Sequence, residues 1–282
     1  MSQVVYLNGS FVPYAEAVVP IEDRGFVFAD GVYEAVRFYG GKPFALDEHL
    51  ARLERSAAAI DLELPAVEEL AMATRETVVR NRCSDAVVYL QVTRGSAPRK
   101  HEFPVPSTTP TVFMIAREVA RPDAKRLAAG VACITVPDIR WHRCNIKSIA
   151  LLPNVLAKQQ AAEAGAAEAV LVRDGVVTEG GSSNFFLVRD SCLFTHPADE
   201  HILAGITRGI VLSLARELRI EVREEKFGLS EVETANEAFI SSTGIEILPV
   251  TTIDDRRVGC GLPGPVTMRL WQAYDARIAQ LS

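Results

Sequence analysis

The 282-residue sequence predicts an α+β fold with a core dominated by sheet. Three observations carry this prediction. Short runs of β-branched and aromatic residues, bounded by turn residues, occur in both halves of the chain. Segments in which apolar residues recur at helical spacing are interspersed among these runs. A polar, Pro-containing stretch at about residues 120–124 separates the two halves, so we expect a link between two domains there.

The N-terminal half is expected to open with a β-hairpin. Val4–Leu7 and Phe11-Val12 flank Asn8-Gly9, a dipeptide that favours a tight turn. A second hairpin is expected where Gly40-Gly41 follows the strand-like run Val32–Tyr39. The other elements expected in this half are a returning strand at Pro43–Leu46, a helix capped by Asp47 and reaching about Ile60, a helix from Pro65 to Asn81, and strands at Ala86–Thr93 and Thr111–Ala116.

The C-terminal half alternates more closely between strands and helices. Asp174-Gly175 indicates a tight turn between two of the strands, and no internal repeat interrupts the pattern. The expected strands are Val131–Val136, Ala169–Arg173, Val176-Val177, Phe185–Val188, Leu193-Phe194 and Phe239-Ile240. The expected helices are Leu152–Gly165, Thr207–Leu218 and Pro265–Leu281.

Composition and charge narrow the class of protein. The formal net charge of -6 argues against a nucleic-acid partner, which usually requires a basic face. The N-terminus does not resemble a signal peptide, and no apolar run is long enough to cross a membrane. Five scattered cysteines without a CxxC pair indicate reduced thiols. We therefore expect a cytoplasmic protein with no membrane partner and no metal site.

Lys147 is the first candidate for chemistry. It lies among Ile146, Ile149, Leu151 and other apolar residues, where a charged ammonium is costly to bury. A buried lysine amine tends toward the uncharged form, which is nucleophilic and can form a covalent bond to a carbonyl group. The alternative is a structural lysine whose amine reaches solvent.

A carboxylate and several polar groups could hold a charged ligand. Glu179 follows a strand and precedes a glycine-rich turn, so it could bind a cationic nitrogen or remain solvated. Thr207 opens a helix whose free N–H groups could bind phosphate, or it could serve as a simple cap. Ser242-Thr243 ends a strand, and Arg52 lies on the first long helix. Both could contact the same phosphate. Alternatively, Ser242-Thr243 could form an ordinary turn at the end of the strand, and Arg52 could be a solvated helix arginine.

The loop from Arg94 to Thr109 is long for a compact domain, which indicates either a function or disorder. If the loop is extended, Arg99 and His101 project to one side and Lys100 projects to the other. An arginine beside an imidazole is a suitable receptor for a carboxylate, whereas a merely solvated basic loop is the alternative.

Taken together, these motifs resemble the fold-type IV pyridoxal-phosphate (PLP) enzymes, a group that includes branched-chain aminotransferases, D-amino-acid aminotransferases and aminodeoxychorismate lyases. The resemblance extends from about Tyr6 to Gln280, and within the group it is greatest to the D-amino-acid (D-alanine) aminotransferases. It is carried by Asp23-Arg24-Gly25, Asp30–Glu34, His49–Leu53, Val92–Gly95, Pro98–His101 with Phe103-Pro104, Asp138–Trp141, Arg143-Cys144, Ile146–Ser148, Thr178–Gly180, Ser183-Asn184 and Gly205–Arg208.

The resemblance implies a small N-terminal α/β domain at residues 1–119, a linker at 120–126 and a larger, barrel-like cofactor-binding domain at 127–282. It also implies residue roles. Lys147 would bind PLP covalently and move the substrate α-proton, and Glu179 would pair with the pyridine nitrogen. The groups implied to hold the phosphate are Arg52, Ile206, Thr207, Ser242 and Thr243. Tyr33, Arg99 and His101 would bind the substrate carboxylate, with Tyr89 nearby and the loop lent to a homodimer partner.

The implied reaction is a ping-pong transfer of the amino group from D-alanine or D-glutamate to 2-oxoglutarate or pyruvate. A branched-chain L-amino-acid aminotransferase and an aminodeoxychorismate lyase are the alternatives on the same fold, and the Arg99–His101 loop disfavours the first. Two positions depart from the family pattern, because Gly181 stands where serine is common and Gly244 where a polar residue is frequent. We expect these departures to affect fine specificity rather than cofactor binding.

Overall fold

The computed structural model describes residues 3–281, and the chain divides into two compact units. The first unit contains the chain up to Ala120, together with Ile146–Ala150 and Leu281, and the second contains Arg121–Asn145 and Leu151–Gln280. The segment that carries Lys147 therefore belongs, by its contacts, to the first unit. The domain boundaries inferred from the sequence stay a prediction.

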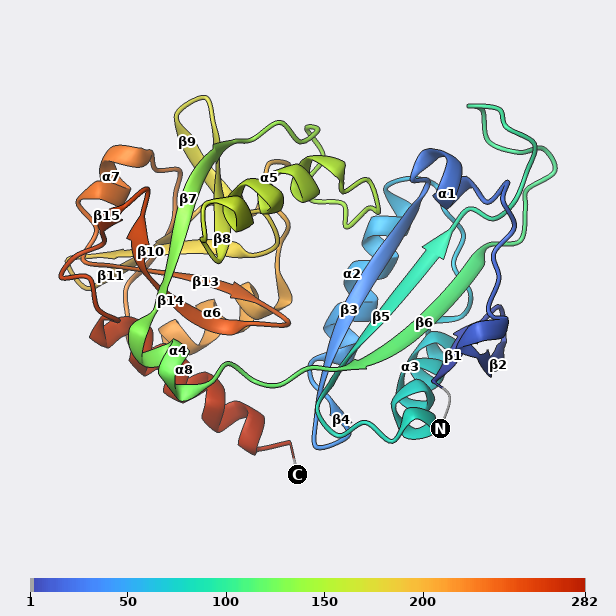
Figure 1. The fold of residues 1–282 in the computed structure, drawn as a ribbon, viewed down its shortest axis with the longest axis horizontal. Helices are drawn as coiled ribbons and strands as arrows, with labels where there is room; N and C mark the ends of the chain where they lie inside the picture. The colour runs from blue at the N-terminus through green and yellow to red at the C-terminus, as the bar shows by residue number, and fades with distance from the viewer. Residues whose placement is uncertain (1–2, 282) are drawn as a thin grey trace. The chain divides into compact units, whose positions relative to one another are not determined.

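The first unit is an antiparallel sheet covered by two helices (Figure 1). Within the described residues its strands are ordered β2-β1-β6-β5-β3-β4 and every pairing is antiparallel. The strands are β1 (Val4–Leu7), β2 (Ser10–Pro13), β3 (Gly31–Tyr39), β4 (Lys42–Pro43), β5 (Ala86–Thr93) and β6 (Thr111–Glu118). The helical segments are η1 (Tyr14–Glu16), α1 (Arg24–Phe28), α2 (Leu46–Ala58) and α3 (Val67–Asn81).

The core of this unit covers one face of β3 and leaves the side chains of the other face outside it. Val32, Val36 and Phe38 alternate along β3 and are completely buried in the cluster that also contains the apolar residues of α2 and α3. Since successive side chains of a strand point to opposite faces, Tyr33, Ala35 and Arg37 lie on the face away from those helices.

Two local predictions in this region were wrong. The returning strand is shorter than Pro43–Leu46, because β4 covers only Lys42–Pro43. Asp47 does not cap α2, since the helix begins one residue earlier, at Leu46, with Ala45 in a left-handed conformation at the N-cap. Asp47 instead lies in the first turn, where a negative charge interacts favourably with the helix dipole.

The second unit is built on a sheet that mixes parallel and antiparallel pairs and curls into an open half-barrel (Figure 1). In the described chain its strand order is β12-β11-β10-β13-β14-β7-β8-β9, with β15 paired to β14. The strands are β7 (Val131–Pro137), β8 (Glu168–Arg173), β9 (Val176–Gly180), β10 (Asn184–Arg189), β11 (Cys192–Thr195), β12 (Val222–Glu224), β13 (Glu237–Ser242), β14 (Glu246–Ile253) and β15 (Arg256–Arg257). The helices are α4 (Ala124–Ala129), α5 (Leu152–Glu163), α6 (Ile206–Glu217), α7 (Leu229–Glu233) and α8 (Pro265–Ala279).

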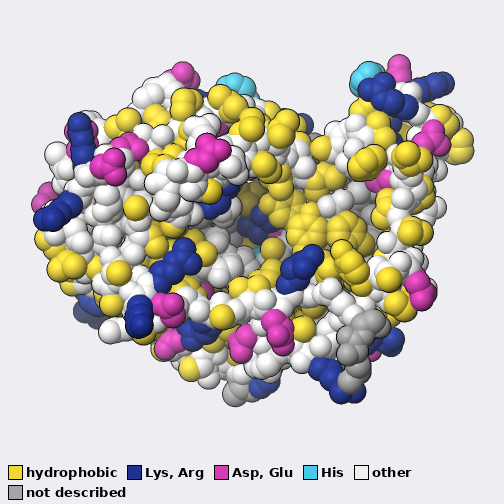
Figure 2. All heavy atoms as spheres, in the orientation of Figure 1, with side chains coloured by type: hydrophobic (Ala, Val, Ile, Leu, Met, Phe, Trp, Pro, Cys, Tyr) yellow, Lys and Arg dark blue, Asp and Glu magenta, His cyan; other side chains and the backbone are white. Residues whose placement is uncertain are grey.

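The predicted α+β class is confirmed, as are the first hairpin and the long helices to within a few residues at their ends. At the first turn, Asn8 and Gly9 both have positive φ, as the Asn-Gly signal requires. No helix among the described residues is long and apolar enough to span a membrane. On the face drawn in Figure 2, basic and acidic side chains are interspersed.

Candidate active site

Lys147 lies beside the edge of the first unit's sheet. The backbone N–H of Tyr33 donates to the Lys147 carbonyl at 3.0 Å, and Ser148 forms an antiparallel bridge with Val32. This register places Lys147 opposite Tyr33, on the strand face away from the helices. The Lys147 ammonium is 4.2 Å from the centre of the Tyr33 ring, and the side chain is half-buried. The predicted lysine is therefore positioned by backbone pairing and held against an aromatic ring.

Tyr33 and Tyr89 form a stacked pair on this face. Their ring centroids are 5.4 Å apart with an interplanar angle of 25°, and the Tyr89 hydroxyl donates to Gln91 Oε1 at 2.6 Å. Burial, together with the nearby Tyr33, raises the pKa of Tyr89 far above its usual range. Tyr89 therefore stays protonated and can donate only as a neutral hydroxyl. The structure brings together three predicted residues here: Lys147, Tyr33 and Tyr89.

Arg52 lies on the helix-covered side of the same sheet, in a buried ion pair. Its Nε and Nη2 donate to the two oxygens of Glu34 at 2.7 and 2.9 Å, and His49 Nδ1 is 2.7 Å from Glu34 Oε2. Burial alone would raise the pKa of Glu34, but Arg52 and His49 hold this pKa at about 2. Glu34 thus orients the guanidinium of Arg52 as a rigid fork. Sequence reasoning missed this role, although His49 and Glu34 both lie in the motifs that carried the resemblance.

The Arg99–His101 loop is ordered around the ring of Phe28. Arg99 lies 5.1 Å from that ring and the His101 ring 5.3 Å from it, so the two side chains approach the same partner. Arg24 fixes the backbone of the loop by donating to the carbonyls of Lys100, His101 and Glu102. Both side chains are exposed, and within the described residues neither hydrogen-bonds to Tyr33.

Arg94 anchors the start of this loop. It forms a two-pronged ion pair with Asp30 at 2.8 and 3.0 Å and also donates to the carbonyls of Ile60 and Asp61. Burial by itself raises the pKa of Asp30, but Arg94 and Arg24 hold this pKa below its usual range. The loop is thus attached by buried charges, and it presents Arg99 and His101 outward.

Glu179, the next-to-last residue of β9 in the second unit, is a buried carboxylate surrounded by donors. It accepts hydrogen bonds from the Arg140 guanidinium, from Asn184 Nδ2 at 2.9 Å and from the Leu203 backbone N–H at 3.1 Å. Asp138 holds Arg140 in turn, at 2.9 and 3.0 Å. Burial lowers the pKa of Arg140, but Asp138 and Glu179 keep this pKa above its usual range. These donors stabilise an ionised Glu179, the form needed to pair with a protonated pyridine nitrogen.

The start of α6 is suited to an anion. No side chain caps this helix, Thr207 is buried in its first turn, and backbone N–H groups at a helix start are available to an oxyanion. A Cβ on the N-cap Gly205 would lie 2.0 Å from Asn184 Oδ1, so only glycine fits between the helix and the Glu179 network. Ser241 of β13, beside Ser242 and Thr243, has a buried hydroxyl without a partner. These residues fit a phosphate.

Gly181 and Gly244 occupy different surroundings. A Cβ on Gly181 would lie 3.2 Å from Glu168 Oε1 and 3.3 Å from Lys158 Cδ, so a serine side chain at this position would be tightly confined. Glu168 uses its other oxygen to accept from Ser182 and Ser183, which holds the turn after Glu179. Gly244 has open space around it. The effect of both departures on specificity stays a prediction.

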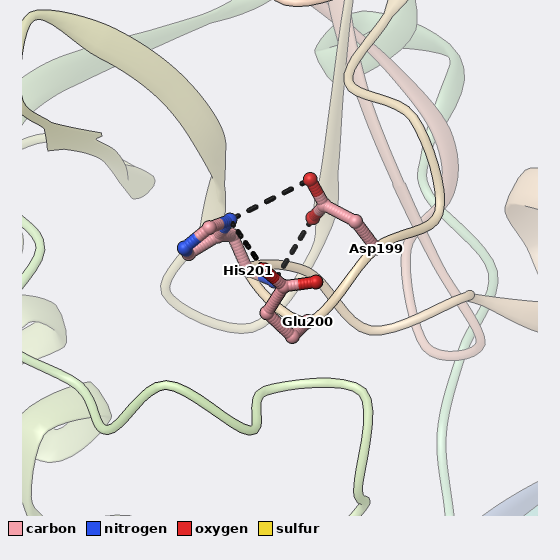
Figure 3. Close-up of side chains that lie close together, drawn as sticks. All are labelled: Asp199, Glu200 and His201. Carbon is pink, nitrogen blue, oxygen red and sulfur yellow. Dashed lines mark hydrogen bonds and ion pairs between the residues drawn. The ribbon is translucent and has the colours of Figure 1, made fainter.

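A cluster of Asp199, Glu200 and His201 also lies in the second unit (Figure 3). Their ligand atoms lie within 4.8 Å of one another, and His201 Nδ1 is 3.5 Å from Asp199 and 3.9 Å from Glu200. Asp199 also pairs with Lys226 at 3.4 Å and accepts from the His201 backbone N–H. A nearby ammonium and internal hydrogen bonds account for these groups, so we assign no metal to them.

The predicted residues therefore divide between the two units. Lys147, Tyr33, Tyr89, Arg52, Arg99 and His101 lie in the first unit, and Glu179, Ile206, Thr207, Ser242 and Thr243 lie in the second. Besides Glu34 and His49, the residues that sequence reasoning left without a role include Arg140, Asp138 and Asn184. Asn184 lies five positions after Glu179, whereas Arg140 lies 39 positions before it and Asp138 acts through Arg140, so no local pattern predicts the support from these two.

The profile of the family described as amino-transferase class IV matches residues 31–253. A "D-alanine aminotransferase" of Bacillus licheniformis is 46% identical over 275 residues, which is 97% of this chain and 96% of that protein. A protein of the same name from Staphylococcus epidermidis is 43% identical and covers 97% of each chain.

Solved structures give a similar result at lower identity. The branched-chain amino acid aminotransferase of Escherichia coli is 28% identical with a TM-score of 0.91, and it covers 98% of this chain and 94% of its own. A branched-chain aminotransferase of the archaeon Thermoproteus uzoniensis, determined with norvaline, is 30% identical with a TM-score of 0.88 and covers 99% and 95%. The likeness extends over almost the whole length in each case.

Proposed function

Because this chain belongs to the class IV aminotransferases, which are PLP-dependent enzymes, we propose that it transfers the amino group of D-amino acids to 2-oxo acids. D-alanine and D-glutamate are the proposed donors, with 2-oxoglutarate and pyruvate as acceptors. The observation that carries the proposal is the position of Lys147 against Tyr33, together with a buried carboxylate, Glu179, surrounded by donors.

Lys147 is proposed to hold the cofactor covalently and to move the proton of the substrate α-carbon. Its backbone pairing with Tyr33 fixes the point from which the amine acts, and the half-buried position limits water around it. Bound PLP supplies an electron-withdrawing ring that stabilises negative charge at the substrate α-carbon. Glu179 is proposed to keep the ring nitrogen protonated, supported by Arg140 and Asn184.

The phosphate of the cofactor is proposed to bind at the start of α6. Ile206 and Thr207 supply backbone N–H groups and a hydroxyl, and Ser242 and Thr243 lie at the end of the neighbouring strand β13. Arg52 is proposed to add a charge-assisted bond, because Glu34 already holds its guanidinium in a fixed orientation.

Arg99, His101 and Tyr33 are proposed to bind the substrate α-carboxylate. Since Arg99 and His101 are exposed and gather on Phe28, their loop is available to a second copy of the chain. We therefore propose a homodimer in which each protomer lends this loop to its partner. Five unpaired cysteines support a reducing compartment, and we propose the cytoplasm.

The D-specific proposal is favoured over the branched-chain alternative by sequence. Relatives named D-alanine aminotransferase are 42–46% identical, whereas the branched-chain structures are 28–30% identical. The purified enzyme should be assayed with D-alanine, L-alanine and L-leucine as donors to 2-oxoglutarate. We expect D-alanine to be the preferred donor by kcat/KM. Preference for L-leucine would establish the branched-chain function instead, and sizing by light scattering tests the dimer independently.

A further inference from the structure

Arg37 is the one buried charged side chain of the described residues whose hydrogen-bonding groups all lack a partner. Its Nε, Nη1 and Nη2 are each buried and unbonded, and the residue is only 2% exposed. The contact it does make is with the Tyr39 ring, 4.9 Å from the guanidinium carbon. Other buried arginines of the same unit, such as Arg52 and Arg94, are paired with carboxylates. Burying a guanidinium without a partner costs free energy, so an anion bound at this position would be stabilising.

The register of the sheet places Arg37 on the same face as the proposed catalytic lysine. Along β3 this face carries Tyr33, then Ala35, then Arg37, and Lys147 lies over Tyr33. Tyr89 lies opposite Ala35, and Val87 lies opposite Arg37. Tyr33 and Arg37 are four residues apart, roughly 13 Å along the strand, and a long arginine side chain can cover part of that span.

The residue between them leaves room on this face. Ala35 has the smallest side chain that still has a Cβ, and Tyr33 and Ala35 are only partly buried. A substrate whose α-carbon lies at Lys147 would therefore extend past Ala35 toward Arg37. The side chain that Arg37 would meet must end in a negative group, because a guanidinium fork forms its strongest pairs with carboxylates.

We infer that Arg37 binds the distal carboxylate of dicarboxylic substrates, namely D-glutamate and 2-oxoglutarate, and so distinguishes them from D-alanine and pyruvate. The inference rests on the proposed transaminase function and names the substrate class of the same site. It leaves Arg99 and His101 to the α-carboxylate, which all the substrates share.

Binding has to draw the guanidinium out of its buried position. What Arg37 gives up is its contact with Tyr39, and what it gains is a charge-assisted pair that no described residue supplies. The arginine has several rotatable bonds, so it can follow the substrate without a change in β3. This movement would let one site accept both short and dicarboxylic substrates.

The test compares Arg37→Met, Arg37→Lys and a matched control, Arg117→Met. Arg117 lies on β6 opposite Val87, on the same sheet face, but it is exposed. Single-turnover reactions of the holoenzyme with D-alanine and with D-glutamate separate the two donors. Titration of the holoenzyme with glutarate and with propionate reports binding of each acid without turnover. Thermal unfolding shows whether a variant has lost stability.

Arg37→Met should raise the apparent Kd for D-glutamate and for glutarate at least tenfold more than the values for D-alanine and propionate. Arg37→Lys should restore part of the difference, and Arg117→Met should change neither. Arg37→Met should unfold at the wild-type temperature or above, because the substitution breaks no hydrogen bond and removes an unpaired buried charge, which outweighs the lost contact with the Tyr39 ring. Equal losses for both donors, an unchanged glutarate affinity, or a marked fall in stability would each overturn the inference. If wild type transaminates neither D-amino acid, the proposed function fails, and the glutarate titration still decides the role of Arg37.

Discussion

Replacing Glu179 by glutamine tests the proposed cofactor carboxylate with the least change in shape. Both oxygens of Glu179 accept hydrogen bonds, from Arg140, Asn184 Nδ2 and the Leu203 N–H. An amide puts an NH2 group against one of these donors and weakens the charge-assisted bond with Arg140. A hydrogen bond to a charged group contributes about 1.5–3 kcal/mol. Since Arg140 keeps its pair with Asp138, we expect Glu179→Gln to lower the free energy of unfolding by about 2–3 kcal/mol.

The effect on turnover should be larger than this loss of stability explains. A neutral amide cannot hold a proton on the ring nitrogen, so kcat should fall roughly 100-fold while PLP remains bound through its phosphate. Glu237→Gln is a matched control, because Glu237 is also buried and accepts from the N–H groups of Val266 and Thr267. Steady-state kinetics, cofactor absorbance and denaturant unfolding should be measured on both variants. If Glu179→Gln turns over as fast as Glu237→Gln, the partner of the ring nitrogen lies elsewhere.

Three other substitutions test separate parts of the site. Lys147→Ala should reduce transamination by several orders of magnitude and abolish borohydride trapping of the cofactor; near-normal turnover would contradict the role of Lys147. Arg99→Ala should raise the KM for D-alanine and for 2-oxoglutarate tenfold or more with PLP retained, and unchanged KM values would remove the loop from the site. The pKa of Glu34 is about 2 in the folded protein and about 4.3 in the unfolded chain, so ionised Glu34 stabilises the fold above pH 4.3. This contribution to the free energy of unfolding, on the order of 3 kcal/mol, should be lost as pH falls toward 2. Acid unfolding of Glu34→Gln, compared with wild type, should therefore show a weaker dependence on pH between about 4 and 2; identical slopes would refute the assignment.

Local sequence signals predicted the elements with strong turn or helix patterns. The Asn8-Gly9 turn and the strand Val32–Tyr39 were predictable, because each signal is contained in a few adjacent residues. Strand β14 was not predicted, although it pairs with both β13 and β7. It contains Pro249, and a proline inside a run usually argues against an interior strand. A shift in register beside Val250 accompanies its pairing with β7, which no local pattern reveals.

The candidate site shows the same limit. The position of Lys147 in the sequence indicated an unusual lysine, but its alignment with Tyr33 depends on pairing between residues more than a hundred positions apart. The support of Glu179 by Arg140 is likewise a contact across 39 positions. Arg37 lies within the strand-like run Val32–Tyr39, and nothing in the neighbouring residues distinguishes it. Its burial without a partner is a property of the folded sheet, and only the structure reveals it.

The hand of the product tests the proposed D-amino-acid transaminase most directly. Lys147 can deliver a proton to one side of the substrate only, so the orientation of the bound α-carboxylate decides which enantiomer forms. Wild-type enzyme should be incubated with D-alanine and 2-oxoglutarate, and the glutamate formed should be resolved by chiral chromatography. We predict D-glutamate as the product, with little formed when L-alanine replaces D-alanine. Accumulation of L-glutamate would contradict the proposal and place the chain with the branched-chain enzymes in function as well as in fold.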